Sequence, residues 1–227
     1  MTLNRKVICF LAILTIVLSA KVGYGQLNEI KIKFIGNCGL HLTDNNLNIY
    51  VDFPYKSGAF NYMQFDKAEL DSIKENSIFI FTHKHPDHYS RKNMRKTLRT
   101  KGGVKYGKWN IKKLDRVSKT TPQFSIQAIK TEHNLSFKHY SYLITWHGKR
   151  IYFYGDTETS DIALSMKNLD WAFVPYWTAK QIQKQNLAID TKMLGIYHFY
   201  PTMKTTNSKP NKVVLLVNQG QTISIPY

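Results

Sequence analysis

The sequence predicts a single α/β domain, and three observations support this class. The chain has 227 residues and is 43% hydrophobic, which is enough for one well-buried domain. Runs of strand-type residues alternate with segments of helical periodicity, and no repeat of roughly 20 to 50 residues is visible. Three histidines and an aspartate follow directly after a continuous apolar run. Folds of the α/β class carry their sites at such strand ends.

The first 25 residues are expected to be a cleaved signal peptide. Residues 4–6 form a short positive region, 7–20 an apolar run, and 23–25 supply small residues before the cleavage position. A retained membrane anchor is the alternative, but this apolar run is short of the ~20 residues that a spanning helix needs. We therefore expect a mature domain, 26–227, without a stable membrane span, located in the periplasm or outside the cell.

The first half of the mature chain is predicted to contain three strands and two helices. Residues 29–34 alternate apolar and charged side chains, as in a half-buried strand, whereas the continuous apolar run 77–81 indicates a strand buried on both faces. Met94 and Leu98 are four residues apart and give helix 90–99 a narrow apolar stripe, which Gly102 and Gly103 end. The remaining expected elements are a strand at 47–53 and a short helix at 67–74.

The second half is predicted to be richer in strands. A turn at 147–149 joins two of them into a hairpin, with His147 facing solvent, and a turn at 218–220 separates the last two. Strands are expected at 124–130, 141–146, 150–154, 171–176, 193–199, 213–217 and 222–225, and helices at 160–167 and 178–188.

Residues 82–88 read THKHPDH and are the strongest chemical signal in the chain. His83 and His85 are two residues apart, so both side chains can face one ion. Asp87 and His88 lie beyond a proline that bends the chain, so they can face a second position. Nitrogen and carboxylate ligands at this density suit Zn²⁺, with Mn²⁺ and Fe²⁺ as alternatives.

Two metal ions need more ligands than these four residues supply, so further histidines and aspartates are expected at the ends of later strands. Three residues fit that description. They are His133, Asp156 in the sequence Gly-Asp-Thr, and His198.

The order H-x-H-x-D-H, a lone histidine, a G-D-T aspartate and a late histidine resembles the metallo-β-lactamase-fold hydrolase superfamily, over essentially the whole mature chain. The resemblance implies a four-layer αββα sandwich with two divalent metal ions. By the same resemblance His83, His85 and His133 hold the first metal, Asp87, His88 and His198 hold the second, and Asp156 bridges both. Asp52 matches a position that supports a ligand histidine, although a simple turn residue is the alternative.

An aspartate at position 156 resembles the glyoxalase-II-like, RNase-Z-like and sugar-phosphate-lactonase-like branches rather than the antibiotic-hydrolysing β-lactamases. The short chain is most similar to the small branch that includes L-ascorbate-6-phosphate lactonase. This implies a hydrolase in which a metal-bridging hydroxide attacks an ester-type bond while Asp87 orients it. Metal binding brings the pKa of water from 15.7 toward roughly 7, which supplies that nucleophile at neutral pH.

Charge indicates an anionic partner. The net charge is +17, and between Arg91 and Lys119 twelve Lys or Arg residues stand against a single acid, Asp115. Such a block attracts phosphate esters, nucleic acid or anionic membranes, and a merely solvated basic face is the alternative. We expect an anionic small-molecule or phosphodiester substrate, or an acidic or phosphorylated lactone.

The competing hypothesis is a metal-stabilised basic module that binds nucleic acid or an anionic envelope polymer without turnover. The complete set of seven ligands favours the enzyme.

The remaining candidate residues have simpler interpretations. His41, His139 and His147 each stand alone and are expected to be surface or core residues without a catalytic role. Cys38 is the sole cysteine after residue 25 and lies in an apolar stretch, so a buried, unreactive thiol is expected. The aromatic residues Tyr176, Trp177 and Tyr200 follow late strands and are expected to line a substrate pocket or to pack at its rim.

Overall fold

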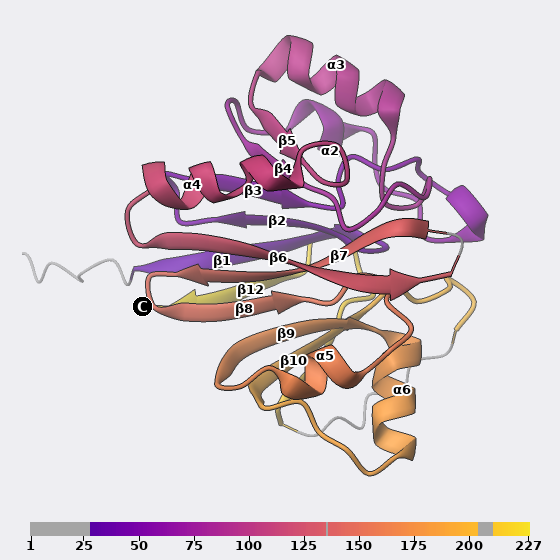
Figure 1. The fold of residues 1–227 in the computed structure, drawn as a ribbon. Coiled ribbons are helices and arrows are strands. Elements are labelled where there is room, and N and C mark those ends of the chain that lie inside the picture. Colours follow the sequence, from indigo (N-terminus) through magenta and orange to yellow (C-terminus); the bar gives the residue numbers. More distant parts are fainter. Residues whose placement is uncertain (1–27, 135, 204–210) are drawn as a thin grey trace, which may run out of the picture.

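The computed structural model describes residues 28–134, 136–203 and 211–227, which form two six-stranded sheets packed face to face (Figure 1). The strand orders are β12-β1-β2-β3-β4-β5 and β11-β10-β9-β8-β7-β6. The expected signal peptide, 1–25, lies outside the described residues. In the part of the chain that is described, no helix has both the length and the apolar character to cross a membrane.

The first sheet is mixed, with antiparallel pairing on one side and parallel pairing on the other. Strands β12, β1, β2 and β3 pair antiparallel, and β3, β4 and β5 pair parallel. The bounds are β1 Glu29–Gly36, β2 Gly39–Thr43, β3 Asn48–Val51, β4 Ile78–Ile80, β5 Val104–Tyr106 and β12 Thr222–Pro226.

The second sheet repeats this mixed pattern. Strands β6, β7 and β8 pair antiparallel, and β8, β9, β10 and β11 pair parallel. The bounds are β6 Phe124–His133, β7 Ser136–Trp146, β8 Lys149–Phe153, β9 Leu169–Pro175, β10 Thr191–Tyr197 and β11 Val213–Leu215.

Helices cover the outer face of each sheet (Figure 1). On the first sheet, Met94 of α3 packs against Phe79 and Phe81 in a core separate from the one between the sheets. On the second, Ala163 of α5 packs with Tyr154. This arrangement confirms the four-layer αββα prediction. The helices are α2 Ala68–Asp71, α3 Arg91–Lys101, α4 Asp115–Thr120, α5 Asp161–Ser165 and α6 Tyr176–Lys184, with 3₁₀ turns η1 Ala59–Asn61 and η2 Ile111–Lys113.

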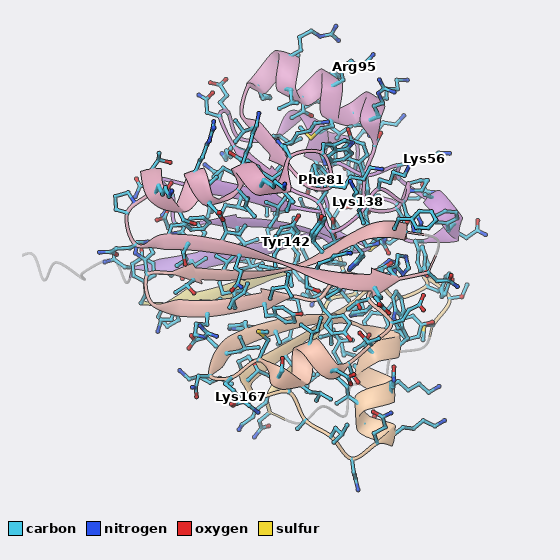
Figure 2. All side chains as sticks on the ribbon, viewed as in Figure 1. Lys56, Phe81, Arg95, Lys138, Tyr142 and Lys167 are labelled. Atoms are coloured by element: carbon cyan, nitrogen blue, oxygen red, sulfur yellow. The ribbon has the colours of Figure 1, made fainter. Side chains whose placement is uncertain are left out.

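The core between the sheets is apolar, and hydrogen bonds join the two sheets beside the histidine-rich motif, among them the bond from Tyr140 N to the carbonyl of Thr82 at 2.9 Å. Ile32 and Phe34 of β1 and Ile144 of β7 are buried there. Tyr142 of β7 donates its hydroxyl to the carbonyl of Phe81, 2.8 Å away (Figure 2). Because Phe81 directly precedes Thr82, this bond ties the start of the motif to the second sheet.

His147 corrects one prediction. We expected this turn residue to face solvent, but its side chain is only 17% exposed. Its Nε2 lies 2.9 Å from Asp44 Oδ2, its Nδ1 lies 2.7 Å from Gln123 Oε1, and its ring stacks on Tyr227. The turn folds against the loop between β2 and β3 and against the C-terminus, which local sequence does not reveal.

Candidate metal centre

The predicted site residues come together at one end of both sheets. The motif 82–88 follows β4, and Asp52 follows β3 in the same sheet. From the second sheet, His133 ends β6, Asp156 follows β8 and His198 follows β10. Parallel pairing of β3 with β4 and of β8, β9 and β10 places these ends side by side. The site is therefore built half from each sheet.

Three histidines form a first group of nitrogen donors. His83, His85 and His133 each offer one ring nitrogen within 4.8 Å of the others. His133 Nε2 lies 3.2 Å from His85 Nδ1, and His83 Nε2 is buried without a hydrogen-bond partner. Burial lowers the pKa of His83 well below its usual value, so its imidazole is neutral and keeps a lone pair. The group can hold one cation.

A second group combines two carboxylates with two histidines, Asp87, His88, Asp156 and His198, and all four residues are buried. Asp156 Oδ2 lies 3.0 Å from His88 Nε2 and 3.4 Å from His198 Nε2. Asp87 Oδ2 lies 3.2 Å from His198 Nε2. These donor atoms surround a single point, as the ligands of one cation do.

Asp156 lies between the two groups. Its Oδ2 is 4.0 Å from His83 Nε2 of the first group as well as 3.0 Å from His88 Nε2 of the second. Its Oδ1 is buried without a hydrogen-bond partner. One carboxylate oxygen thus contacts the second group, while the other remains available to a cation.

The electrostatics of the site pair two carboxylates with two imidazoles. Burial opposes the charged forms of His88 and His198, but Asp156 and the other nearby acidic groups outweigh it and raise both pKa values. Burial disfavours the charged forms of Asp87 and Asp156, but His88 and His198 outweigh it and hold both carboxyl pKa values below their usual range. Buried polar atoms without partners are rare in native proteins. Asp87 Oδ1 and His198 Nδ1 are two more of them. A divalent cation, which binds to carboxylates and to deprotonated imidazole nitrogens, would satisfy these unpaired atoms.

Asp52 orients one of these histidines. Its Oδ1 accepts a hydrogen bond from Thr82 N at 2.8 Å, and its Oδ2 accepts one from Thr82 Oγ1 at 2.9 Å. His88 Nδ1 lies 3.0 Å from the same Oδ2. Because an ionised carboxylate only accepts, His88 in its neutral, metal-binding form must carry its proton on Nδ1, which turns the Nε2 lone pair toward the second group. Asp52 is buried and has φ of 47°, a conformation fixed by these bonds.

His139 has a role at the site that the sequence analysis missed. It is fully buried, and its Nε2 accepts a hydrogen bond from the backbone N–H of Asp156 at 2.9 Å. Burial lowers its pKa to about 3, so the ring is neutral and its Nδ1 proton is donated to Thr131 Oγ1. Gly155, at φ of 68°, leaves room for the ring, since a Cβ there would stand 2.7 Å from His139 Nε2. His139 therefore fixes the backbone that carries Asp156.

Cys38 is buried beside the second group, as expected, and its sulfur lies 3.3 Å from His88 Nδ1. Burial raises the pKa of its thiol, so the group stays protonated. This agrees with the unreactive thiol that the apolar sequence around it predicts.

Aromatic rings form one wall of the site around His198. The Trp177 ring lies 4.9 Å from that of His198, and Tyr200 stacks on Tyr62 at 4.3 Å. Tyr62, which the sequence did not single out, contacts the His198 ring edge-on at 4.3 Å. Burial raises the pKa of Tyr62, and neighbouring Tyr200 adds to the shift, so its hydroxyl remains a hydrogen-bond donor.

Comparison with known proteins places the fold. No protein-family model matches the sequence, and no curated protein does. Solved structures do match. A protein from Parabacteroides distasonis, described as a metal-dependent hydrolase, has a TM-score of 0.61 and 20% identity, covering 84% of this chain and 94% of its own. The metallo-β-lactamase fold protein YhfI from Bacillus subtilis has a TM-score of 0.63 and 13% identity, with 87% and 99% covered.

The chain has the metallo-β-lactamase fold. A diphosphatase of the PhnP family shares it as well, with a TM-score of 0.57, 11% identity, and 88% of this chain and 98% of that chain covered. The resemblance read from the histidine and aspartate pattern is confirmed at the level of the metallo-β-lactamase fold. At these identities the likeness establishes the architecture, and activity must be argued from the site.

Proposed function

We propose that this protein is a dinuclear metal-dependent hydrolase that cleaves an ester-type bond in an anionic substrate. The observation that carries the proposal is the pair of adjacent donor groups with Asp156 between them. His83, His85 and His133 are assigned to the first metal. The second takes the group of Asp87, His88 and His198. Asp156 is assigned to both.

Two cations bound in these positions would lower the pKa of a shared water and polarise the bond that it attacks. Zn²⁺ suits the histidine-rich donor set best, with Mn²⁺ and Fe²⁺ as alternatives. The PhnP-family diphosphatase with the same fold supports a phosphodiester among the candidate substrates. An acidic or phosphorylated lactone is the other leading chemistry.

Asp87 is assigned the task of orienting the attacking water. Its Oδ2 contacts His198 Nε2, and its Oδ1 is buried without a hydrogen-bond partner, so this oxygen can accept a hydrogen bond from the water. The lowered pKa of Asp87 keeps it ionised and therefore an acceptor at neutral pH. Whereas Asp87 accepts hydrogen bonds, Tyr62 keeps its hydroxyl protonated and can donate one to the substrate.

Metal analysis combined with an ester panel tests this function. The panel holds bis(p-nitrophenyl) phosphate, a lactone, a thioester and a β-lactam. We expect close to two metal ions per chain and turnover of an anionic ester, and Asp156→Asn should lower both together because it removes the charge that offsets two cations. One metal per chain, unaffected by His198→Ala, would contradict the dinuclear site. Full metal content without turnover of any ester would favour the binding module instead.

We also propose that residues 1–25 direct export to the periplasm or outside the cell and are then removed. The support is the order of charged, apolar and small residues in that segment. Expression of the full chain in a bacterial host, followed by fractionation and N-terminal sequencing, tests it. A mature start near Gln26 is expected, and an intact N-terminus in the cytoplasm would refute it.

A further inference from the structure

A basic and aromatic groove borders the metal centre on the side of the first sheet. Six side chains line a groove of about 630 Å³, and none of them is acidic. They are Lys84, Tyr89, Arg91, Lys105, Lys108 and Trp109.

The groove is joined to the centre through the chain itself. Lys84 is exposed although it stands between His83 and His85, whose rings turn inward toward the first donor group. Tyr89 directly follows His88. The groove and the donor groups therefore share the loop 83–89.

Positive charge in the groove is crowded and unneutralised. Partial burial lowers the pKa of Lys108, and the nearby ammonium groups of Lys84 and Lys138 lower it further. Lys138, labelled in Figure 2, comes from β7 of the second sheet. Within the described residues, no carboxylate forms an ion pair with Lys84, Lys105 or Lys108. Like charges held together in this way are stabilised by an anion.

The aromatic residues of the groove form a platform. Trp109 is 43% exposed and packs against Tyr89, with ring centroids 4.7 Å apart. Lys105 Nζ lies 4.4 Å from the Trp109 ring and donates a hydrogen bond to Tyr89 Oη at 3.0 Å. Tyr89 therefore packs against Trp109 and the Lys105 ammonium lies over its ring, while Trp109 remains 43% exposed. A planar base can stack on such a surface, and every nucleic acid base offers a π-face.

Helix α3 extends the positive surface beyond one phosphate. Arg91 also lines a second groove, whose other cationic side chains are Lys92, Arg95, Lys96 and Arg99. Arg95 projects outward from this helix (Figure 2). At 1.5 Å per residue, Arg91 to Arg99 spans about 12 Å. A single phosphate contacts only part of this row of cationic side chains, whereas a phosphodiester chain can extend along all of it.

We propose that the groove binds single-stranded nucleic acid, with backbone phosphates on Lys84, Lys105 and Lys108 and a base stacked on Trp109. If the bound strand is also the substrate, the proposal rests on the hydrolase function proposed above. Binding itself is tested by affinity alone, so the binding groove and the hydrolase function can fail separately.

Fluorescence anisotropy with hydrolysis-resistant phosphorothioate oligonucleotides of about 12 nucleotides, a length within the range of single-strand binding sites, measures this binding on the metal-loaded protein. Trp109→Ala should weaken binding roughly 5-fold or more, and Trp109→Phe should restore most of it. Lys84→Gln/Lys108→Gln should reduce the slope of log affinity against log salt by about 1.4, since each lost single-strand phosphate contact removes about 0.7. Thermal unfolding verifies that each variant is folded.

The matched control is Lys112→Gln/Lys113→Gln, which removes two exposed charges of the same basic segment outside the groove. The control should change affinity and salt slope little. Equal effects of both double variants, or wild-type binding by Trp109→Ala, would overturn the groove. Binding to phosphatidylglycerol vesicles with the same residue dependence, and none to oligonucleotides, would assign the surface to membranes and refute the proposal.

Binding measurements with oligouridylate and with oligodeoxythymidylate distinguish RNA from DNA as the preferred strand. Hydrolysis of all four esters of the panel described above is followed in parallel. Retained hydrolysis without oligonucleotide binding would refute the groove alone, and binding without any hydrolysis would refute the hydrolase alone.

Discussion

Replacing Asp52 by asparagine should weaken metal binding at the second position and leave the affinity of the first position unchanged. The side chain keeps its size, and its oxygen can still accept the hydrogen bond from Thr82 N at 2.8 Å. The amide –NH₂ then replaces Oδ2, which lies 3.0 Å from His88 Nδ1. A donor now faces His88 Nδ1, so this nitrogen must accept and the imidazole proton moves to Nε2.

The new tautomer works against metal binding. A proton on His88 Nε2 points at Asp156 Oδ2, 3.0 Å away, and the resulting hydrogen bond occupies both ligand atoms. A cation must first reverse this arrangement. Loss of outer-shell partners of metal-bound histidines costs roughly 10- to 100-fold in metal affinity. This corresponds to about 1.4–2.8 kcal/mol at one position, while the group of His83, His85 and His133 keeps its affinity.

Metal titration in chelator-buffered solutions, with content measured by mass spectrometry, resolves the two positions. Asp44→Asn is the matched control, because Asp44 also accepts backbone N–H bonds with one oxygen and contacts a histidine, His147, with the other. It lies at the opposite end of β2 and β3 from Asp52 and should leave metal content unchanged. Wild-type affinity of Asp52→Asn at both positions, or equal losses in the two variants, would refute the tautomer argument.

Three further predictions concern the scaffold of the site. Gly155→Ala should lower the melting temperature and the metal content, because the new Cβ would stand 2.7 Å from His139 Nε2 and the alanine would have to adopt a φ of 68°. An unchanged melting temperature would contradict the close packing. Tyr142→Phe should cost about 1 kcal/mol by removing the bond to Phe81 O, a fall of about 2–4 °C in calorimetry. His139→Phe leaves Asp156 N–H unpaired and should weaken metal binding in the same titration, and His139→Gln should recover part of it if acceptance of that bond is the role.

The parts of the site that could be predicted are those encoded locally. Residues 82–88 carry four candidate ligands within one loop after a buried strand, so spacing alone predicted that these side chains gather there. The helix predicted at 90–99 is Arg91–Lys101, with Ser90 as its N-cap, accepting a hydrogen bond from Asn93 N, and with its end at Gly102, where the glycines predicted it. Periodicity also located most strands, with end positions shifted by a few residues where pairing rather than composition sets the bounds.

The parts that were missed depend on contacts between distant segments. His139 acquires its role because β7 pairs with β6, opposite Thr131, and because Gly155 follows β8 beneath it. Tyr62 reaches His198 from a loop with no periodic pattern. Strand β5 has only three residues, and parallel pairing with β4 stabilises it. A short strand or a single side chain has too little local signal for its neighbours to be inferred.

The division of the ligands between the two sheets links metal binding to the packing of the fold. His83, His85, Asp87 and His88 belong to the first sheet, and His133, Asp156 and His198 to the second. Each proposed cation therefore has ligands from both halves, and the complete donor set exists only when the apolar core between them is closed. A cation that binds only this closed form stabilises it by about 2.7 kcal/mol when its concentration is 100 times the dissociation constant. Two side chains hold the motif in place where the sheets meet. Tyr142 ties the second sheet to the residue before the motif, and Asp52 fixes the motif on its own sheet. With cations bound, the core, the hydrogen bonds at its edge and the cations would form one cooperative unit, in which a loss at any member would weaken the other two.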